Sequence, residues 1–168
     1  MIVVSDSTPL ISLMKASQLG ILQKMFGEIL IPETVYLELT TNDSFRDEAA
    51  TIKESDYIRV VAVNDQKAVS LLQRATGLDK GESEAIVYAD DHHADVLLMD
   101  EAAGRKVAQG MGLAIMGSVG ILISAFKEGI LTVNEVEDAF DSMKQANRHI
   151  SDRLIQDALM IVHDSPDR

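Results

Sequence analysis

The chain has 168 residues, of which 46% are hydrophobic, and this combination fits one folded domain and excludes a disordered chain. It contains no cysteine, which excludes disulfides, thiolate metal sites and a cysteine nucleophile and fits a cytoplasmic location. Its net charge of −12 and its few aromatic residues argue against strong nonspecific binding of nucleic acid, which rests on clustered Lys and Arg.

Predicted strands and helices alternate along the chain. Runs of Val, Ile and Leu predict strands at residues 2–4, 28–31, 58–63, 96–99 and 113–116. Helical spacing predicts helices at residues 9–26 in two pieces, 32–41, 44–54, 66–75, 81–93 and 102–110, with two or three more from residue 118 onward. The strands lack polar alternation, which is typical of strands buried on both faces. The pattern therefore predicts an α/β fold, a three-layer α/β/α sandwich around a central parallel sheet with right-handed crossovers.

The last part of the chain is helical in pattern and highly charged. We interpret residues 131–168 as an extension packed on the main domain of residues 1–130, or as partner-binding structure, without recognisable chemistry of its own. The longest uncharged stretch, residues 111–126, is shorter than the roughly 20 residues of a membrane span. Asp6 also comes too early for a signal peptide. We therefore expect no membrane segment.

Two acids stand directly at the ends of predicted strands. Asp6 follows the first strand and Asp100 follows the fourth, and ligands of open α/β sheets bind beyond the carboxyl ends of the strands. A purely structural interpretation makes Thr8 the N-cap of the next helix, with Pro9 in its first turn, but it leaves Asp6 without a role. Asp100 is either a helix cap or a functional acid.

Three glutamates have competing interpretations. Glu82 has capping-box spacing with Asp79, but it also shares a helix face with small apolar residues such as Ala85, so it heads the stripe that packs on the sheet. Glu84 lies on another face and is expected to be solvated. Glu101 is expected to form a surface ion pair with Arg105, four residues further on.

Gathered carboxylates need a physical reason, because they repel one another and burial raises their pKa values. A hard divalent cation relieves this repulsion, since Mg²⁺ prefers oxygen ligands and is usually held by a few carboxylates and a substrate phosphate. The sequence has no persuasive catalytic triad, P-loop or dinucleotide-binding motif. Glu38, between two leucines on a short predicted helix, looks like an exposed glutamate when it is considered alone.

Four segments together resemble the PIN-domain family, which includes the toxin ribonucleases of VapBC toxin–antitoxin pairs. The similar segments are residues 3–11 with Asp6, 31–39 with Glu38, 81–87 with Glu82, and 97–101 with Asp100, followed by Arg105. Glu82 and Asp100 are 18 residues apart, which is close to the spacing in related toxins and favours Glu82 over Glu84. The resemblance covers residues 1–129 and is closest to a PIN-like subgroup with a Gly-Glu-x-Glu-Ala motif and a helical C-terminal extension.

The resemblance implies an endoribonuclease that hydrolyses phosphodiester bonds with a metal-activated water. The catalytic and metal-binding acids would be Asp6, Glu38, Glu82 and Asp100, around Mg²⁺ or Mn²⁺. Thr8 or Ser7 would orient the water or Asp6, and Arg105 or Lys106 would contact phosphate. The expected partners are an RNA substrate, an antitoxin protein and a second copy in a homodimer. The third acid is usually Asp in the toxins and is Glu82 here.

Two other functions stay open at this point. A non-catalytic interaction module that keeps the fold agrees with the acidic charge and the charged helical tail. A phosphatase of the haloacid dehalogenase type would use Asp6 as a covalent nucleophile. That family has a second Asp two residues later, where this chain has Thr8.

Overall fold

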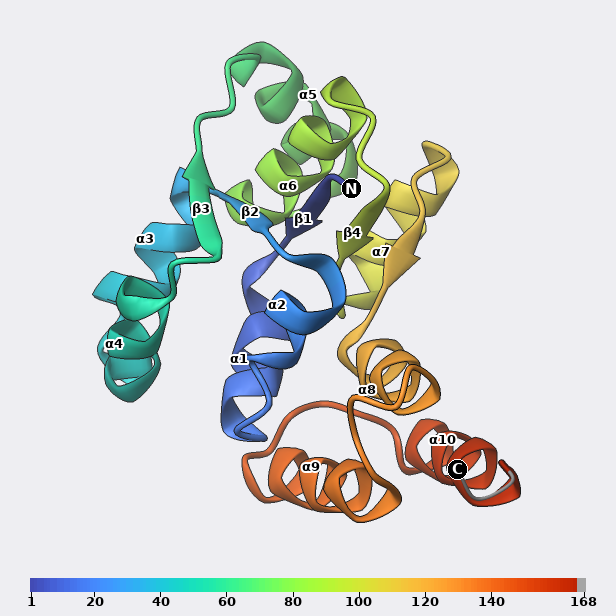
Figure 1. Cartoon of the computed structure of the whole chain (residues 1–168). Coiled ribbons are helices and arrows are strands. Elements are labelled where there is room, and N and C mark those ends of the chain that lie inside the picture. The colour runs from blue at the N-terminus through green and yellow to red at the C-terminus, as the bar shows by residue number, and fades with distance from the viewer. Residues whose placement is uncertain (166–168) are drawn as a thin grey trace.

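A computed structural model of the chain, which describes residues 1–165, shows the predicted three-layer α/β/α sandwich (Figure 1). The strands are β1 (Val3–Ser5), β2 (Ile29–Pro32), β3 (Ile58–Val61), β4 (Val96–Leu98) and β5 (Ile115–Met116). All of them are parallel, in the order β3-β2-β1-β4-β5. The predicted strand ends differ from these by no more than two residues.

Helices connect the strands and cover the sheet. The helices are α1 (Ser7–Lys15), α2 (Ile21–Phe26), α3 (Glu33–Thr41), α4 (Arg46–Glu54), α5 (Gln66–Thr76), α6 (Lys80–Asp91), α7 (Ala102–Gly110), α8 (Ser118–Lys127), α9 (Val133–Gln145) and α10 (Asp152–Asp164), with a short 3₁₀ helix η1 (Asp43–Phe45) before α4. The predicted helix at residues 9–26 is two helices, and the predicted helical region after residue 118 is three.

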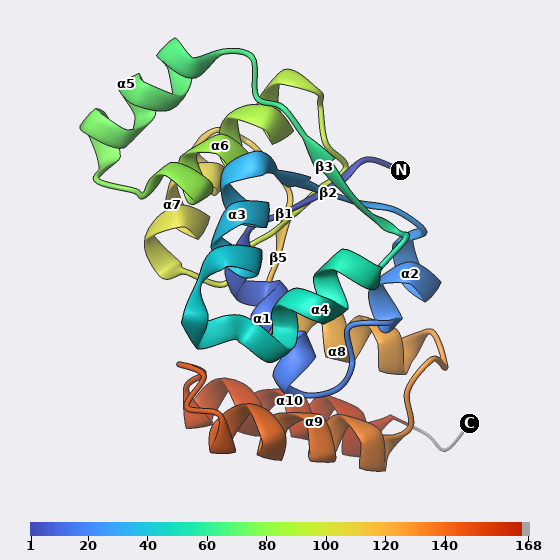
Figure 2. The ribbon, with the colours of Figure 1, turned by 90° about the vertical axis from the view of Figure 1, so that its left-hand side faces the viewer.

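Each face of the sheet is covered by its own set of helices (Figure 2). Val4 and Leu97, which are paired between β1 and β4, pack with α6 and α7 on one face. Val3 and Leu98 point to the other face and pack with α1, α2 and α8. Because neighbouring strand residues point to opposite faces and both faces are covered, the central strands carry no polar alternation.

The C-terminal helices α9 and α10 form a further layer below α1 and α8 (Figure 2). Phe140 of α9 and Ile155 of α10 are buried in the same apolar cluster as the helices above them. The division of the chain at residue 130 stays a prediction, and residues 166–168 of the predicted extension lie outside the described residues. No helix within residues 1–165 is both long enough and apolar enough to cross a bilayer.

Candidate active site

The end of β1 delivers Asp6 into the interior. Asp6 is only 2% exposed, and its backbone N–H donates to the carbonyl of Leu98 at 3.0 Å, which ties the end of β1 to the end of β4. Its extended backbone occupies the N-cap position of α1, which begins at Ser7. The prediction of Thr8 as the N-cap is therefore wrong, because the helix starts one residue before Thr8.

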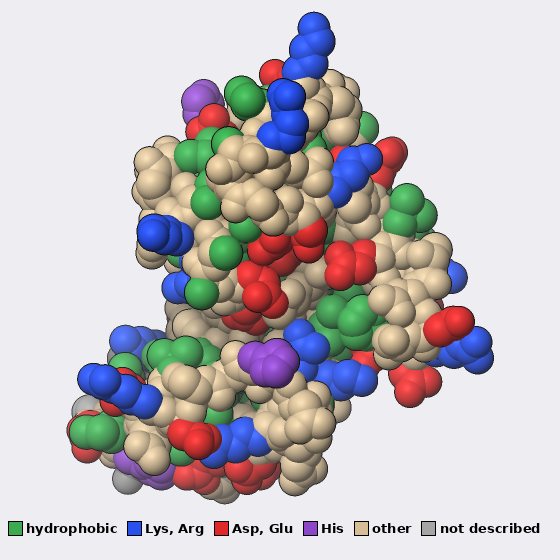
Figure 3. Space-filling view, turned by 180° about the vertical axis from the view of Figure 1, so that it is seen from behind, with side chains coloured by type: hydrophobic (Ala, Val, Ile, Leu, Met, Phe, Trp, Pro, Cys, Tyr) green, Lys and Arg blue, Asp and Glu red, His purple; other side chains and the backbone are tan. Residues whose placement is uncertain are grey.

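Asp6 lies within electrostatic reach of acids that come from two other helices. Burial raises the pKa of Asp6 to about 8, the Ser7 backbone amide opposes this shift, and the negative charges of Glu82, Asp79 and Glu38 add to it. Burial likewise raises the pKa of Glu38, a partly buried residue of α3, against a hydrogen bond from the Ser7 side chain. The structure thus brings Asp6, Glu38 and Glu82 together, and Figure 3 shows acidic side chains gathered in a hollow on this face.

Glu82 completes the capping box of α6 and is also buried near the other acids. Asp79 Oδ1 accepts the Glu82 backbone N–H at 2.8 Å, and Glu82 Oε2 accepts the Asp79 backbone N–H at 3.1 Å, so the predicted capping box is confirmed. Burial raises the pKa of Glu82, and the charges of Asp79, Glu101 and Glu38 raise it further. Glu82 Oε1 faces Gly104, where an added Cβ would lie only 3.0 Å from it.

Asp100 lies beyond the end of β4 in a different environment. Its Oδ1 accepts the Ser118 backbone N–H at 2.7 Å, and the Ser118 hydroxyl donates to both carboxylate oxygens, at 3.1 and 3.0 Å. Asp100 therefore binds the first residue of α8 and does not cap α7, whose N-cap position is occupied by Glu101. The expected ion pair of Glu101 and Arg105 is also not formed among the described residues.

Arg105 instead turns toward the end of β4. Its Nη1 donates to the carbonyl of Met99 at 2.9 Å. An added Cβ at Gly117 would lie 2.8 Å from Asp100 Oδ1 and 2.9 Å from Arg105 Nη1. Glycine at position 117 therefore lets the Asp100 carboxylate and the Arg105 guanidinium approach the same backbone segment.

Glu84 contradicts its predicted exposure. It is 4% exposed, and its Oε1 accepts a hydrogen bond from the Gln66 amide at 3.2 Å and lies 3.8 Å from the Lys80 ammonium. Its Oε2 is buried without a hydrogen-bond partner. Helix α5 packs over this part of α6, and the helix pattern of α6 alone carried no sign of that cover.

A cleft of about 660 Å³ borders this edge of the sheet. Asp100, Glu101, Arg105 and Thr8 line its core side, whereas Lys106 is exposed outside it. Arg148 and His149, from the loop between α9 and α10, line the opposite side. The sequence interpretation missed both residues, because no local pattern links this loop to the strand ends.

The donor set fits a hard divalent cation, because the gathered side chains offer only carboxylate oxygens and none of the ion pairs among the described residues includes Asp6. Within residues 1–165, however, no three His, Asp or Glu side chains are arranged to hold a metal ion. Glu82 Oε2 accepts a hydrogen bond from Asp79, and both Asp100 oxygens accept hydrogen bonds from Ser118.

Fold and site together define a class: an α/β/α sandwich of parallel strands with carboxylates collected at the carboxyl edge. In a comparison with protein families, the profile described as PIN domain matches residues 2–164. The chain therefore belongs to the PIN domain family, and the match extends through α9 and the whole of α10. PIN domains are generally nucleases that use divalent metal ions. Comparisons with curated proteins and with solved structures returned no match.

Proposed function

We propose that this PIN domain is a metal-dependent endoribonuclease in which Asp6, Glu38, Glu82 and Asp100 hold Mg²⁺ or Mn²⁺ at a phosphodiester. The observation that carries the proposal is the burial of Asp6 near three other acids, at the edge of the sheet where ligands of such folds bind; within residues 1–165 no Lys or Arg forms an ion pair with it. Such a cluster lowers the stability of the fold and is best explained by a cation that it serves to bind.

The side chains have separable tasks in this proposal. A bound Mg²⁺ or Mn²⁺ would lower the pKa of a water molecule and stabilise charge that develops on the phosphate. Ser7 positions two of the acids, because its hydroxyl hydrogen-bonds Glu38 and its backbone amide favours ionised Asp6. Arg105, held by the Met99 carbonyl beside Asp100, orients a phosphate oxygen.

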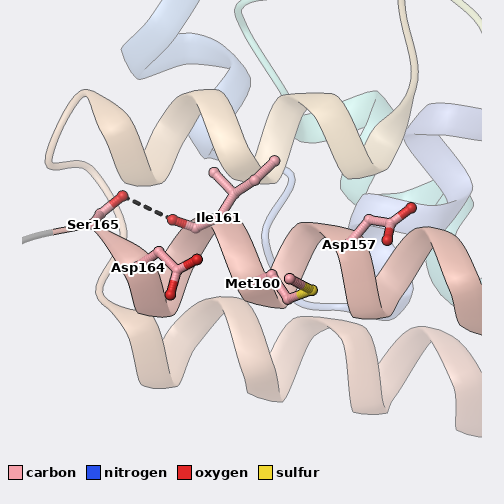
Figure 4. A pocket seen from close by; sticks show the side chains of 5 residues that line it. All are labelled: Asp157, Met160, Ile161, Asp164 and Ser165. Atoms are coloured by element: carbon pink, nitrogen blue, oxygen red, sulfur yellow. Dashed lines mark hydrogen bonds between the residues drawn. The ribbon is translucent and has the colours of Figure 1, made fainter.

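We also propose that the enzyme is a cytoplasmic toxin restrained by an antitoxin protein, and that it forms a homodimer. Support for a protein partner comes from the outer face of α10, where Met160 is 62% and Ile161 42% exposed between Asp157 and Asp164 (Figure 4). Exposed apolar groups rimmed by charges are typical of protein interaction sites. Light scattering of the purified chain tests the homodimer directly.

The decisive experiment compares cleavage of a labelled RNA by the wild type, Asp6→Asn and Asp100→Asn in the presence of Mn²⁺. We expect both variants to lose cleavage while their circular dichroism stays native. Asp138→Asn, an exposed acid of α9, is the matched control and should retain cleavage. Full activity in both site variants would overturn the proposed mechanism.

A non-catalytic interaction module is the second candidate. Two observations favour it: the net charge of −12, and the lack of a ready arrangement of metal ligands in the described part of the chain. Calorimetry with Mn²⁺ separates the candidates, because a module without a site binds no metal at these acids. The phosphatase of the haloacid dehalogenase type gains no support from the PIN family match.

A further inference from the structure

The loop between α9 and α10 forms one wall of the cleft whose other wall carries the acids. Arg148 and His149 of this loop line the cleft of about 660 Å³ together with Asp100 and Glu101. Figure 3 shows basic side chains on the lower body, next to the acidic hollow. The extension therefore closes a two-sided cleft that the β-sheet edge alone would leave open.

The loop is held in a fixed conformation by its own backbone. Asn147 has a positive φ of 53°, its N–H donates to the Lys144 carbonyl at 3.0 Å, and the Arg148 N–H donates to the Met143 carbonyl at 3.0 Å. These two bonds form a Schellman motif, which ends α9 and turns the chain sharply. Ile150, two residues further on, packs against the main apolar cluster. Arg148 is therefore placed before any ligand arrives.

The Arg148 side chain is anchored on the main domain. Its Nε donates to the hydroxyl of Ser12, a buried residue of α1, at 3.1 Å. No carboxylate forms an ion pair with Arg148 in residues 1–165. The chain has far more acidic than basic residues, yet the half-buried Arg148 guanidinium has no acidic partner among the described residues. It therefore has N–H donors left for an incoming anion, and its planar shape matches the geometry of a phosphate.

We propose that Arg148 and His149 bind a single RNA strand, with Arg148 on a backbone phosphate and His149 stacked on an unpaired base. This inference rests on the proposed function, since it names the part of the substrate that lies next to the cleavage site. Proteins that read single-stranded RNA use these two contacts, aromatic or histidine rings for the bases and arginine for the backbone. The volume of this cleft, about 660 Å³, is in the range of pockets that take small ligands, which fits part of a single strand.

The test measures binding separately from cleavage. Fluorescence anisotropy of a short unstructured labelled RNA is recorded with the full chain in EDTA, for the wild type, Arg148→Ala, Arg148→Lys and His149→Ala. Arg153→Ala, an exposed arginine of α10 outside the cleft lining, is the control with the same change of charge. Thermal unfolding of each variant establishes that it is folded.

We expect Arg148→Ala to weaken binding about tenfold, because a hydrogen-bonded charged contact is lost. The slope of log affinity against log salt should fall in magnitude by about 0.7, the value for one phosphate contact on a single strand. Arg148→Lys keeps the charge but not the fork, so it should restore the slope and only part of the affinity. His149→Ala should weaken binding without changing the slope.

The proposal would be overturned if Arg148→Ala and Arg153→Ala had equal effects on binding, or if Arg148→Ala left the salt slope unchanged. A wild type that binds no RNA, or that binds a duplex equally well, would also overturn it. Arg148-dependent binding without any cleavage in Mg²⁺ or Mn²⁺ would support the cleft and refute the nuclease. Cleavage by Arg148→Ala with an unchanged KM would support the nuclease and refute the cleft.

Discussion

The ends of β1 and β4 carry the same type of residue in two different electrostatic environments. Asp6 and Asp100 follow neighbouring parallel strands at the same edge of the sheet. Asp6 is buried beside other acids, and its pKa rises to about 8. Both oxygens of Asp100 accept hydrogen bonds from Ser118 at the start of α8, where the helix dipole favours a negative charge.

The two environments show that a carboxylate can be kept at a site either against electrostatic repulsion or by hydrogen bonds that stabilise it. The acids around Asp6 repel one another and lower the free energy of unfolding, and a bound cation would offset this loss. Asp100 is held in place by α8 and helps to begin that helix. One half of the site is therefore electrostatically strained, and the other half is part of the structural framework.

Among variants that leave Asp6 and Asp100 intact, the largest loss of cleavage is expected from a change at Glu38, on the strained side. Glu38→Gln removes a charged oxygen from a proposed metal ligand and should lower cleavage at least about 100-fold. Ser118→Ala removes only the hydroxyl that binds Asp100, so it should lower the rate of cleavage about tenfold or less. Glu84→Gln is the control, since Glu84 is also a buried glutamate but accepts a hydrogen bond from Gln66. Cleavage is measured as kcat/KM. Equal losses in all three variants would contradict the distinction between the strained side around Asp6 and the hydrogen-bonded side around Asp100.

A methyl group at residue 117 should disturb the Asp100 side without touching an acid. Gly117→Ala places a Cβ 2.8 Å from Asp100 Oδ1 and 2.9 Å from Arg105 Nη1, so one or both side chains must move. We expect cleavage to fall about tenfold. Gly110→Ala, at the end of α7 with open space around it, should retain activity and gain up to about 1 kcal/mol. Wild-type activity in Gly117→Ala would show that the placement of Asp100 is not critical.

Stability should change in opposite directions at the two strand ends. Asp6→Asn removes a buried repelled charge and should raise the melting temperature at pH 8 in EDTA by at least about 3 °C. Asp100→Asn weakens the contact with α8 and should lower it by about 2 °C. Differential scanning calorimetry measures both. A shift of the same sign in the two variants would contradict the comparison. Added Mn²⁺ should stabilise the wild type and not Asp6→Asn.

The burial of Asp6 should also make the stability of the fold depend on pH. The pKa of Asp6 is about 8 in the folded chain against 3.8 ordinarily, so between these values the folded chain holds a proton that the unfolded chain has lost. The free energy of unfolding should therefore decrease as pH rises from about 4 to 8 and then level off. In Asp6→Asn the decline should be shallower. Melting temperatures of the wild type and of Asp6→Asn are measured across this pH range in EDTA. The same dependence of melting temperature on pH in both proteins would refute the raised pKa.

Local sequence patterns predicted much of the framework. The apolar runs predicted all five strands, and Asp79 with Glu82 predicted the capping box, because such signals depend on residues a few positions apart. The patterns also predicted that Asp6 and Asp100 would share one edge. They failed for Thr8 and for the expected pair of Glu101 and Arg105, where the helix start and the Met99 carbonyl decided the outcome.

By itself, the sequence determined the succession of strands and helices along the chain, the acids at the strand ends and the PIN family. These features depend on local periodicity and on the order of the motifs. The family resemblance named Glu38, but only the tertiary structure decided that it is partly buried near Asp6, that Glu84 is covered by α5, and that Arg148 reaches Ser12 from 136 residues away. Burial and charge at these positions come from segments remote in sequence, and a helix pattern carries no record of what packs against it.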